Sequence, residues 1–167
     1  MSKIKLSNVR LSFPSLFQRA SFDGQEGKFE ATFLIEKGSA NANKIQAAVD
    51  AIVKENKAKL PGDKICLKDG DLVSYDGYEG MLALKGTSNK RVTVINRDKS
   101  PIVEDDGIIY AGAYVNCIVD LWFMDNKFGK RVLCNLLGVQ FAKDGEAFGA
   151  GGLADDDFDT IEDDDFI

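Results

Sequence analysis

Apolar and polar residues alternate over much of the chain, which is the pattern of strands that bury one face. The clearest case is residues 28–36, where Phe29, Ala31, Phe33 and Ile35 point one way and the polar residues between them point the other. Because side chains on a strand alternate between its two sides, this segment predicts a strand with one face in the core.

Residues 3–13 alternate in the same way, but with one interruption. The apolar positions are Ile4 and Leu6 before the break, and Val9, Leu11 and Phe13 after it, in the opposite parity. One extra residue in a strand reverses the parity without ending the strand. We therefore expect a β-bulge near Ser7-Asn8.

The longest strand pattern covers residues 110–124. One parity is wholly apolar and is expected to face the core: Ala111, Ala113, Val115, Cys117, Val119, Leu121 and Phe123. The other parity mixes aromatic rings with hydrogen-bonding groups: Tyr110, Gly112, Tyr114, Asn116, Ile118, Asp120, Trp122 and Met124. A turn at residues 126–129 leads into a returning strand at 130–142.

One helix is expected over residues 40–60. Ser39 can cap its start, and Pro61-Gly62 would end it. Its apolar residues follow helical spacing: Ile45, Val49, Ile52, Val53 and Leu60. Three shorter strands are expected near residues 64–68, 81–86 and 91–95, and residues 96–109 form a long loop.

Many short strands with one helix favour a mainly β fold, an OB-fold-like antiparallel β-barrel with one prominent α-helix. We expect one domain over residues 1–147 and a flexible acidic C-terminal tail over residues 148–167. The chain has no apolar run long enough to span a membrane, and no secretory signal opens it, so we expect a cytoplasmic protein.

Charge divides the chain into two parts. The net charge of the 167 residues is −6, but residues 144–167 hold ten of the 27 acids and no Lys or Arg. Residues 1–143 therefore carry seventeen acids against all 21 bases, a net charge of +4. A basic body beside an acidic arm indicates an anionic partner that competes with the arm.

The chain contains no histidine, which removes the commonest general base and the usual zinc ligand. Cys66, Cys117 and Cys134 form no CxxC pair, and two of them lie in apolar runs, so they are expected to be buried free thiols. We expect no enzymatic reaction, no cofactor and no metal site.

The polar face of residues 110–124 is the candidate binding surface. Aromatic rings on an outward barrel face can stack on unpaired bases. The candidate DNA-binding residues are Tyr110, Tyr114, Trp122 and Asn116 on this strand, with Lys85, Lys90, Arg91, Arg97 and Lys130 for the phosphates. Tyr75 and Tyr78 could extend the stacking surface or only pack a turn. The alternative is that the rings pack under the helix and the long loop, and that the bases form an ordinary solvated surface.

The last thirteen residues, 155–167, contain eight acids and end in Phe166-Ile167. An acidic arm on a basic body can imitate the nucleic-acid backbone and compete with a weak ligand. A tail that served only solubility would gain nothing from its apolar residues. We expect the end of the tail to bind partner proteins through Asp163, Asp164, Asp165, Phe166 and Ile167.

These features resemble a phage family of single-stranded DNA-binding proteins, once catalogued as a domain of unknown function. The resemblance rests on Gly80 with Leu84-Lys85, the run Tyr110–Asn116, Leu137–Gln140 and Asp144–Glu146. The ending resembles the acidic tails of bacterial and phage single-stranded DNA-binding proteins, although it lacks their Pro-Phe pair. The resemblance implies an OB fold and non-specific coating of single strands in phage replication or recombination.

Two functions follow as hypotheses. In the first, the protein binds single-stranded DNA without sequence preference, recruits replication or recombination proteins through its tail, and can form a homo-oligomer. In the second, it is a β-rich structural or adaptor phage protein that docks on basic partners through its tail and does not bind DNA.

Overall fold

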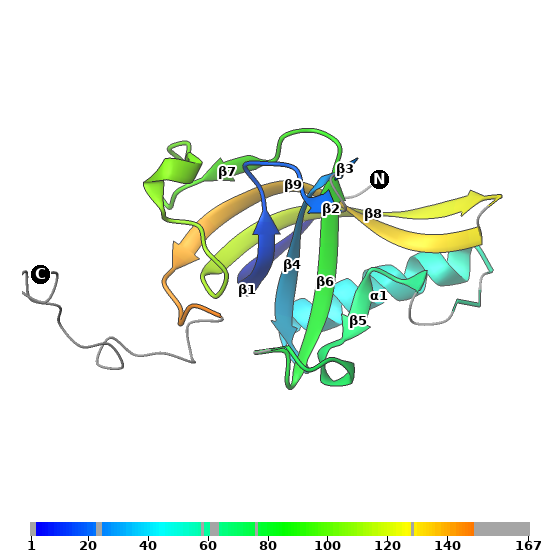
Figure 1. Ribbon diagram of the computed structural model, residues 1–167. Helices are drawn as coiled ribbons and strands as arrows, with labels where there is room; N and C mark the ends of the chain where they lie inside the picture. Colours follow the sequence, from blue (N-terminus) through cyan, green and yellow to red (C-terminus); the bar gives the residue numbers. More distant parts are fainter. Residues whose placement is uncertain are drawn as a thin grey trace, which may run out of the picture.

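The computed structural model describes residues 3–22, 25–57, 59–60, 64–75, 77–127 and 129–148. Five strands form its framework: β1 (Ile4–Ser15), β4 (Phe29–Glu36), β6 (Met81–Ser88), β8 (Tyr114–Asn126) and β9 (Gly129–Lys143). They follow one another in the order β6-β4-β1-β8-β9, and a parallel contact between Thr87 and Asn135 joins β9 back to β6. The sheet thus closes into a barrel (Figure 1), which confirms the expected mainly β, OB-fold-like class.

Smaller elements extend the barrel at its edges. β5 (Leu67–Asp69) pairs with β6, and β7 (Thr93–Ile95) pairs in parallel with β9. β2 (Ser21–Phe22) and β3 (Gln25–Glu26) form a small hairpin between β1 and β4. Two short 3₁₀ turns, η2 (Gly70–Leu72) and η3 (Glu104–Asp106), lie in the long connections.

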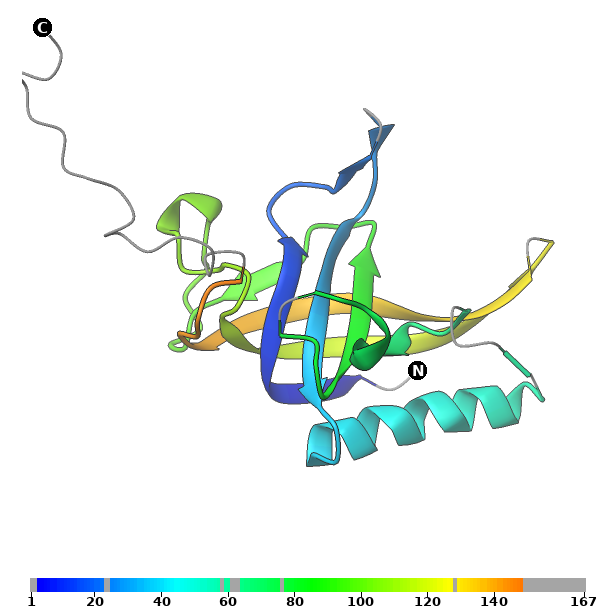
Figure 2. The same ribbon diagram turned by 60° about the horizontal axis from the view of Figure 1, so that its bottom comes forward.

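Helix α1 (Ala40–Glu55) connects β4 to the β5–β6 region and lies along one side of the barrel, beneath the β8–β9 hairpin (Figure 2). Ser39 caps it as expected, because its side chain accepts a hydrogen bond from the Ala42 N–H. The helix ends five residues before the expected end at residue 60, because Lys57 adopts a positive φ of 50°. The proposed stop at Pro61-Gly62 lies outside the described residues.

The barrel interior is filled by the apolar parity of each strand. All four expected residues of β4 are buried, and so are the central residues of the β8 core face, whereas Phe123 is only half-buried. On α1, Ile45 and Val49 enter the same core. Within the described part of the chain, no helix is long and apolar enough to cross a membrane.

The expected bulge in β1 is confirmed. The pairing of β1 with β8 shifts between Leu6 and Val9, and Asn8 has a positive φ of 54°. The expected start of β8 at residue 110 is wrong, since the strand begins at Tyr114. Residues 110–113 form a turn in which Gly112 has a φ of 110°, a conformation that residues with a side chain rarely adopt.

Candidate functional site

A groove of about 710 Å³ lies on the outward face of β4 and β6. In this barrel these are the second and third strands, since β2 and β3 belong to a separate hairpin. The groove is lined by Phe13, Glu30, Thr32, Lys64, Ile65, Cys66, Lys68, Asp69, Gly70, Val73, Tyr75, Tyr78, Ala83, Lys85, Thr87, Arg131, Val132, Leu133 and Cys134. It is thus framed by β1, β4, β6 and β9 and by the connection between β5 and β6.

Three aromatic rings form one wall of the groove. Phe13 and Tyr75 meet edge to face with centroids 5.1 Å apart, and Tyr75 meets Tyr78 in the same way at 5.2 Å. Tyr78 is only 4% exposed, whereas Phe13 and Tyr75 are 57% and 56% exposed. Two rings therefore present free surface to a ligand, and the third supports them from below.

Phe13 is exposed because of a second irregularity in β1. The sequence pattern placed it with Val9 and Leu11 on the core face, but the pairing of β1 with β4 shifts between Ser12 and Ser15. Phe13 itself has a positive φ of 46°. This local turn of the backbone carries the ring out of the core and into the groove.

Tyr78 holds the aromatic wall to the barrel. Its hydroxyl lies 2.8 Å from the Ser12 hydroxyl, and both side chains are buried. Burial raises the pKa of the Tyr78 hydroxyl above its ordinary value. The phenol therefore stays neutral and serves as a structural hydrogen-bonding group.

The loop that carries Tyr75 and Tyr78 will be called the wall loop (residues 70–75 and 77–80). Lys37 at the end of β4 bridges Asp69 and Asp71, at N–O distances of 2.6 and 2.5 Å. Asp71 also accepts a hydrogen bond from the Gly80 N–H, which ties the two ends of the wall loop together. Hydrogen bonding from Lys37 lowers the pKa of both carboxyl groups.

Cations outnumber anions around the groove. Lys64, Lys68, Lys85 and Arg131 line it, against Glu30 and Asp69. Asp69 is neutralised by Lys37, and Glu30 lies 3.3 Å from the Lys85 ammonium group. The groove therefore combines exposed ring faces with a surplus of positive charge.

Apolar and thiol groups form the inner part of the groove. Burial raises the pKa of the Cys66 thiol to about 12, and burial also raises the pKa of Cys134. These thiols are therefore protonated and poorly nucleophilic at neutral pH. Across β8 and β9, Trp122 lies directly opposite Leu133, so its half-buried ring shares the face of a groove-lining residue.

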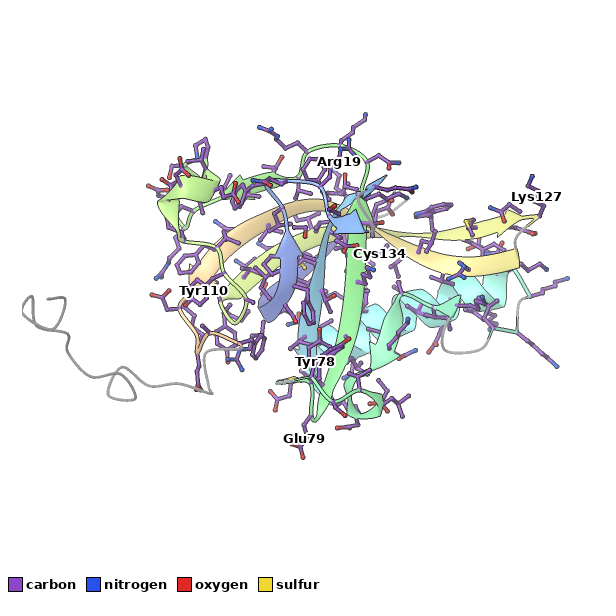
Figure 3. All side chains as sticks on the ribbon, in the orientation of Figure 1. Arg19, Tyr78, Glu79, Tyr110, Lys127 and Cys134 are labelled. Carbon is purple, nitrogen blue, oxygen red and sulfur yellow. The ribbon has the colours of Figure 1, made fainter. Side chains whose placement is uncertain are left out.

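The predicted aromatic residues do not form one surface. Tyr114 and Trp122 are eight residues apart on β8, about 26 Å at roughly 3.3 Å per residue. Lys127 lies near the tip of the β8–β9 hairpin, and Tyr110 lies at the opposite end of the molecule (Figure 3). Its hydroxyl donates to Asp144 and accepts from the Gly145 N–H at 3.0 Å. Of the predicted residues, Lys85 lines the groove, Trp122 lies across from the groove residue Leu133, and Tyr110 is not part of the groove.

Tyr114 and Asn116 are engaged in contacts within the protein. Lys143 and Arg10 lie over the Tyr114 ring, at 4.8 and 5.8 Å from its centroid. Asn116 accepts a hydrogen bond from the Asn8 N–H and donates one to the Gln140 side chain. It thereby fixes the bulge of β1.

The remaining predicted cations are exposed at several places on the surface. Lys90 and Arg91 lie between β6 and β7, Arg97 follows β7, and Lys130 is the second residue of β9. The predicted tail residues Asp163, Asp164, Asp165, Phe166 and Ile167 lie outside the described residues.

Most of the groove was not predicted from the sequence. Phe13 was expected in the core, and Lys64 and Lys68, which are distant in sequence from β8, were not among the predicted cations. Tyr75 and Tyr78 were considered from the sequence either as an extension of the stacking surface or as turn packing. In the structure both rings line the groove, Tyr75 exposed and Tyr78 buried. Among the described residues, no three Cys, Asp or Glu side chains gather closely enough to hold a metal ion.

Comparisons with known proteins agree on one family. The family model described as the Enterobacter phage Enc34 ssDNA-binding protein matches residues 2–167. Protein p50 of Acyrthosiphon pisum secondary endosymbiont phage 1 is 40% identical over 173 residues, covering 95% of this chain and 94% of that protein.

Solved structures show the same similarity. The Enc34 single-stranded DNA-binding protein in complex with ssDNA superposes with a TM-score of 0.78 at 32% identity, over 88% of this chain and 89% of that one. Bacteriophage T7 gp2.5, also a single-stranded DNA-binding protein, gives a TM-score of 0.55 at 13% identity, over 93% and 98% of the two chains. At that identity the second similarity shows the fold alone.

Proposed function

This chain belongs to the family of the Enterobacter phage Enc34 ssDNA-binding protein, and we propose that it binds single-stranded DNA without sequence preference. The observation that carries the proposal is the groove on β4 and β6, where two exposed rings lie beside four cations. In OB folds the outward face of the second and third strands is the usual site for oligonucleotides. The family is described by DNA binding and not by a reaction.

Phe13 and Tyr75 are proposed to stack on bases. Stacking of a base on an aromatic ring contributes about 1–3 kcal/mol and tolerates any sequence, because every base has a flat face. Trp122 is proposed to contact a further nucleotide where the groove meets the β8–β9 hairpin, since it shares the face of Leu133.

Lys64, Lys68, Lys85 and Arg131 are proposed to contact phosphates inside the groove. Of the cations predicted from the sequence, Lys85 belongs to this set. Lys90, Arg91, Arg97 and Lys130 are proposed to meet the strand outside it. The geometry favours structural roles for Tyr110, Tyr114 and Asn116, whose polar groups or ring faces are engaged within the protein.

We further propose that the protein acts in phage DNA replication or recombination in the host cytoplasm. The acidic residues of 149–167 would compete with DNA for the groove and, once displaced, bind partner proteins through Phe166 and Ile167. In support of this, Phe148, the last residue that the structure describes, contacts the wall loop at Gly77. The nineteen residues after it could extend about 65 Å, so the tail can reach the groove from there.

Binding is tested by titrating the protein into a labelled thymidine oligonucleotide and into a duplex of the same length, at two salt concentrations. We expect tight binding to the single strand, weakened by salt, with quenching of Trp122 fluorescence at saturation. Trp122 is the only tryptophan, so the signal reports one position. An adaptor protein that does not bind DNA would show no binding to either probe and no quenching of Trp122 fluorescence.

A further inference from the structure

Phe148, the last residue of the described body, is held at three points. Its N–H donates to the Ala111 carbonyl at 3.0 Å. The Arg10 guanidinium lies over its ring, 4.1 Å from the centroid. On another side the ring packs directly against Gly77, since a Cβ there would lie 2.3 Å from its Cε1 atom.

Arg10 is fixed in place by the main chain. Its Nε donates to the Gly112 carbonyl at 3.1 Å and its Nη2 donates to the Glu146 carbonyl at 2.5 Å. The backbones also meet closely, because a Cβ on Gly112 would lie 2.2 Å from the Glu146 oxygen. Arg10 is therefore held in place by two main-chain carbonyls and forms a platform for the Phe148 ring.

Gly77 belongs to the wall loop and lies two residues from Tyr75. Lys37 and Asp71 anchor the two ends of this loop, and Tyr78 is buried against Ser12. Tyr75 is 56% exposed, and its ring meets the rings of Phe13 and Tyr78 edge to face. Gly77 itself has a φ of +81°, and an alanine there would displace the Phe148 ring.

We propose that Phe148 is a positioning residue for the DNA groove. Its ring, clamped between Arg10 and Gly77, holds the wall loop so that Tyr75 faces the groove. The proposal rests on the proposed function in one respect, namely that Tyr75 contacts a base. The residue that fixes the groove wall is then the same one from which the acidic tail departs, so the tail begins at the wall of the site.

The first test needs no DNA. In the full-length chain, Phe148→Ala is expected to speed amide hydrogen exchange at Tyr78 and Met81, whose N–H groups donate within the wall loop. Phe148→Tyr keeps the ring and should exchange like the parent. Glu146→Gln is the matched control, since Arg10 binds the main-chain carbonyl of Glu146 and not its carboxylate. Equal exchange in Phe148→Ala and the parent would overturn the proposal.

The second test measures affinity for a thymidine oligonucleotide by fluorescence anisotropy. Phe148→Ala is expected to weaken binding about five- to tenfold, at the lower end of the range for loss of one base–ring stack, and Phe148→Tyr is expected to bind like the parent. Should Phe148→Ala not fold, Phe148→Leu keeps the bulk without the flat ring and should show the same loss. Faster wall-loop exchange with unchanged affinity would overturn the positioning role. If the parent protein itself binds no DNA, the proposed function is wrong, but the role of Phe148 can still be tested. In that case, equal wall-loop hydrogen exchange in Phe148→Ala and the parent would contradict the proposal that Phe148 holds the loop.

Discussion

At the scale of single residues, Tyr75 and Phe13 carry the most specific prediction. Tyr75→Ala should weaken binding to a thymidine oligonucleotide by about 1–3 kcal/mol, roughly five- to 150-fold, because one base loses its stacking partner. Tyr75→Phe keeps the ring and should bind like the parent. Since more than half of Tyr75 is exposed, the thermal midpoint should change little. A normal affinity for Tyr75→Ala would exclude this ring from the interface.

The Glu30–Lys85 pair predicts a gain in DNA affinity, opposite to the loss expected for Tyr75→Ala. Glu30 is the acidic groove residue that pairs with a groove cation, at 3.3 Å from Lys85. Glu30→Gln should tighten binding to single strands, since it frees the ammonium group for a phosphate and removes a repelling charge.

Lys85→Ala should weaken binding and reduce the slope of log affinity against log salt by about 0.7, the value for one phosphate contact on a single strand. Lys54, exposed on α1, is the matched control, and its substitution should leave the slope unchanged. Equal slopes for Lys85→Ala and the parent would place the phosphates elsewhere.

At the scale of elements, the wall loop should respond to pH through Lys37. The pKa values of Asp69 and Asp71 lie below their ordinary 3.8, mainly because Lys37 donates hydrogen bonds to them. A lowered carboxyl pKa contributes stability above pH 3.8 that is lost as the pH falls through the lowered value. The Lys37→Met variant should therefore show faster wall-loop exchange than the parent at pH 7, and the difference should shrink below pH 3.8. A difference that persisted at low pH would rule out the ionic bridge as its cause.

The strands were predictable because parity is a local property. The strand at residues 28–36 was predictable without knowing which strands pair with it. The first bulge of β1 was predictable because the parity of the apolar residues reverses between Leu6 and Val9. The turn at residues 110–113 was not predictable, since it depends on the approach of Glu146, more than thirty residues away. The alternation of apolar and polar residues continues through Gly112, so the sequence pattern does not indicate the turn.

The groove was harder to predict than the barrel for a similar reason. Its residues come from β1, β4, β6 and β9, from β5 and the segment just before it, and from the wall loop. The contact of β9 with β6 closes the barrel between the strands that carry Lys85 and Arg131. The prediction relied on rings and cations that are close together along the chain. Tyr110 and Tyr114 fit that pattern, but their side chains make contacts within the protein.

At the scale of the whole molecule, the distribution of charge determines how the tail should act. Residues 149–167 contain eight acids and no bases, so the chain through Phe148 carries nineteen acids and 21 bases, a net charge of +2. The positive charge of the body is thus small, and the tethered tail more than cancels it. A tethered competitor acts at an effective concentration near the millimolar range for a short flexible link.

Neutralising the tail should therefore tighten binding to single-stranded DNA. In the full-length chain, replacing its eight acids by Asn and Gln keeps the length and the apolar residues and removes only the charge. We expect the neutralised variant to bind single-stranded DNA more tightly than the parent at low salt. The difference in affinity should decrease as salt rises, because screening weakens the attraction of both the tail and the DNA to the groove. Replacing Phe166 and Ile167 by Ser is the complementary variant and should leave DNA affinity unchanged, since these residues are proposed to serve protein partners. If neutralising the acids left the affinity unchanged at every salt concentration, the tail would not compete for the groove, and its acidity would have to serve partners alone.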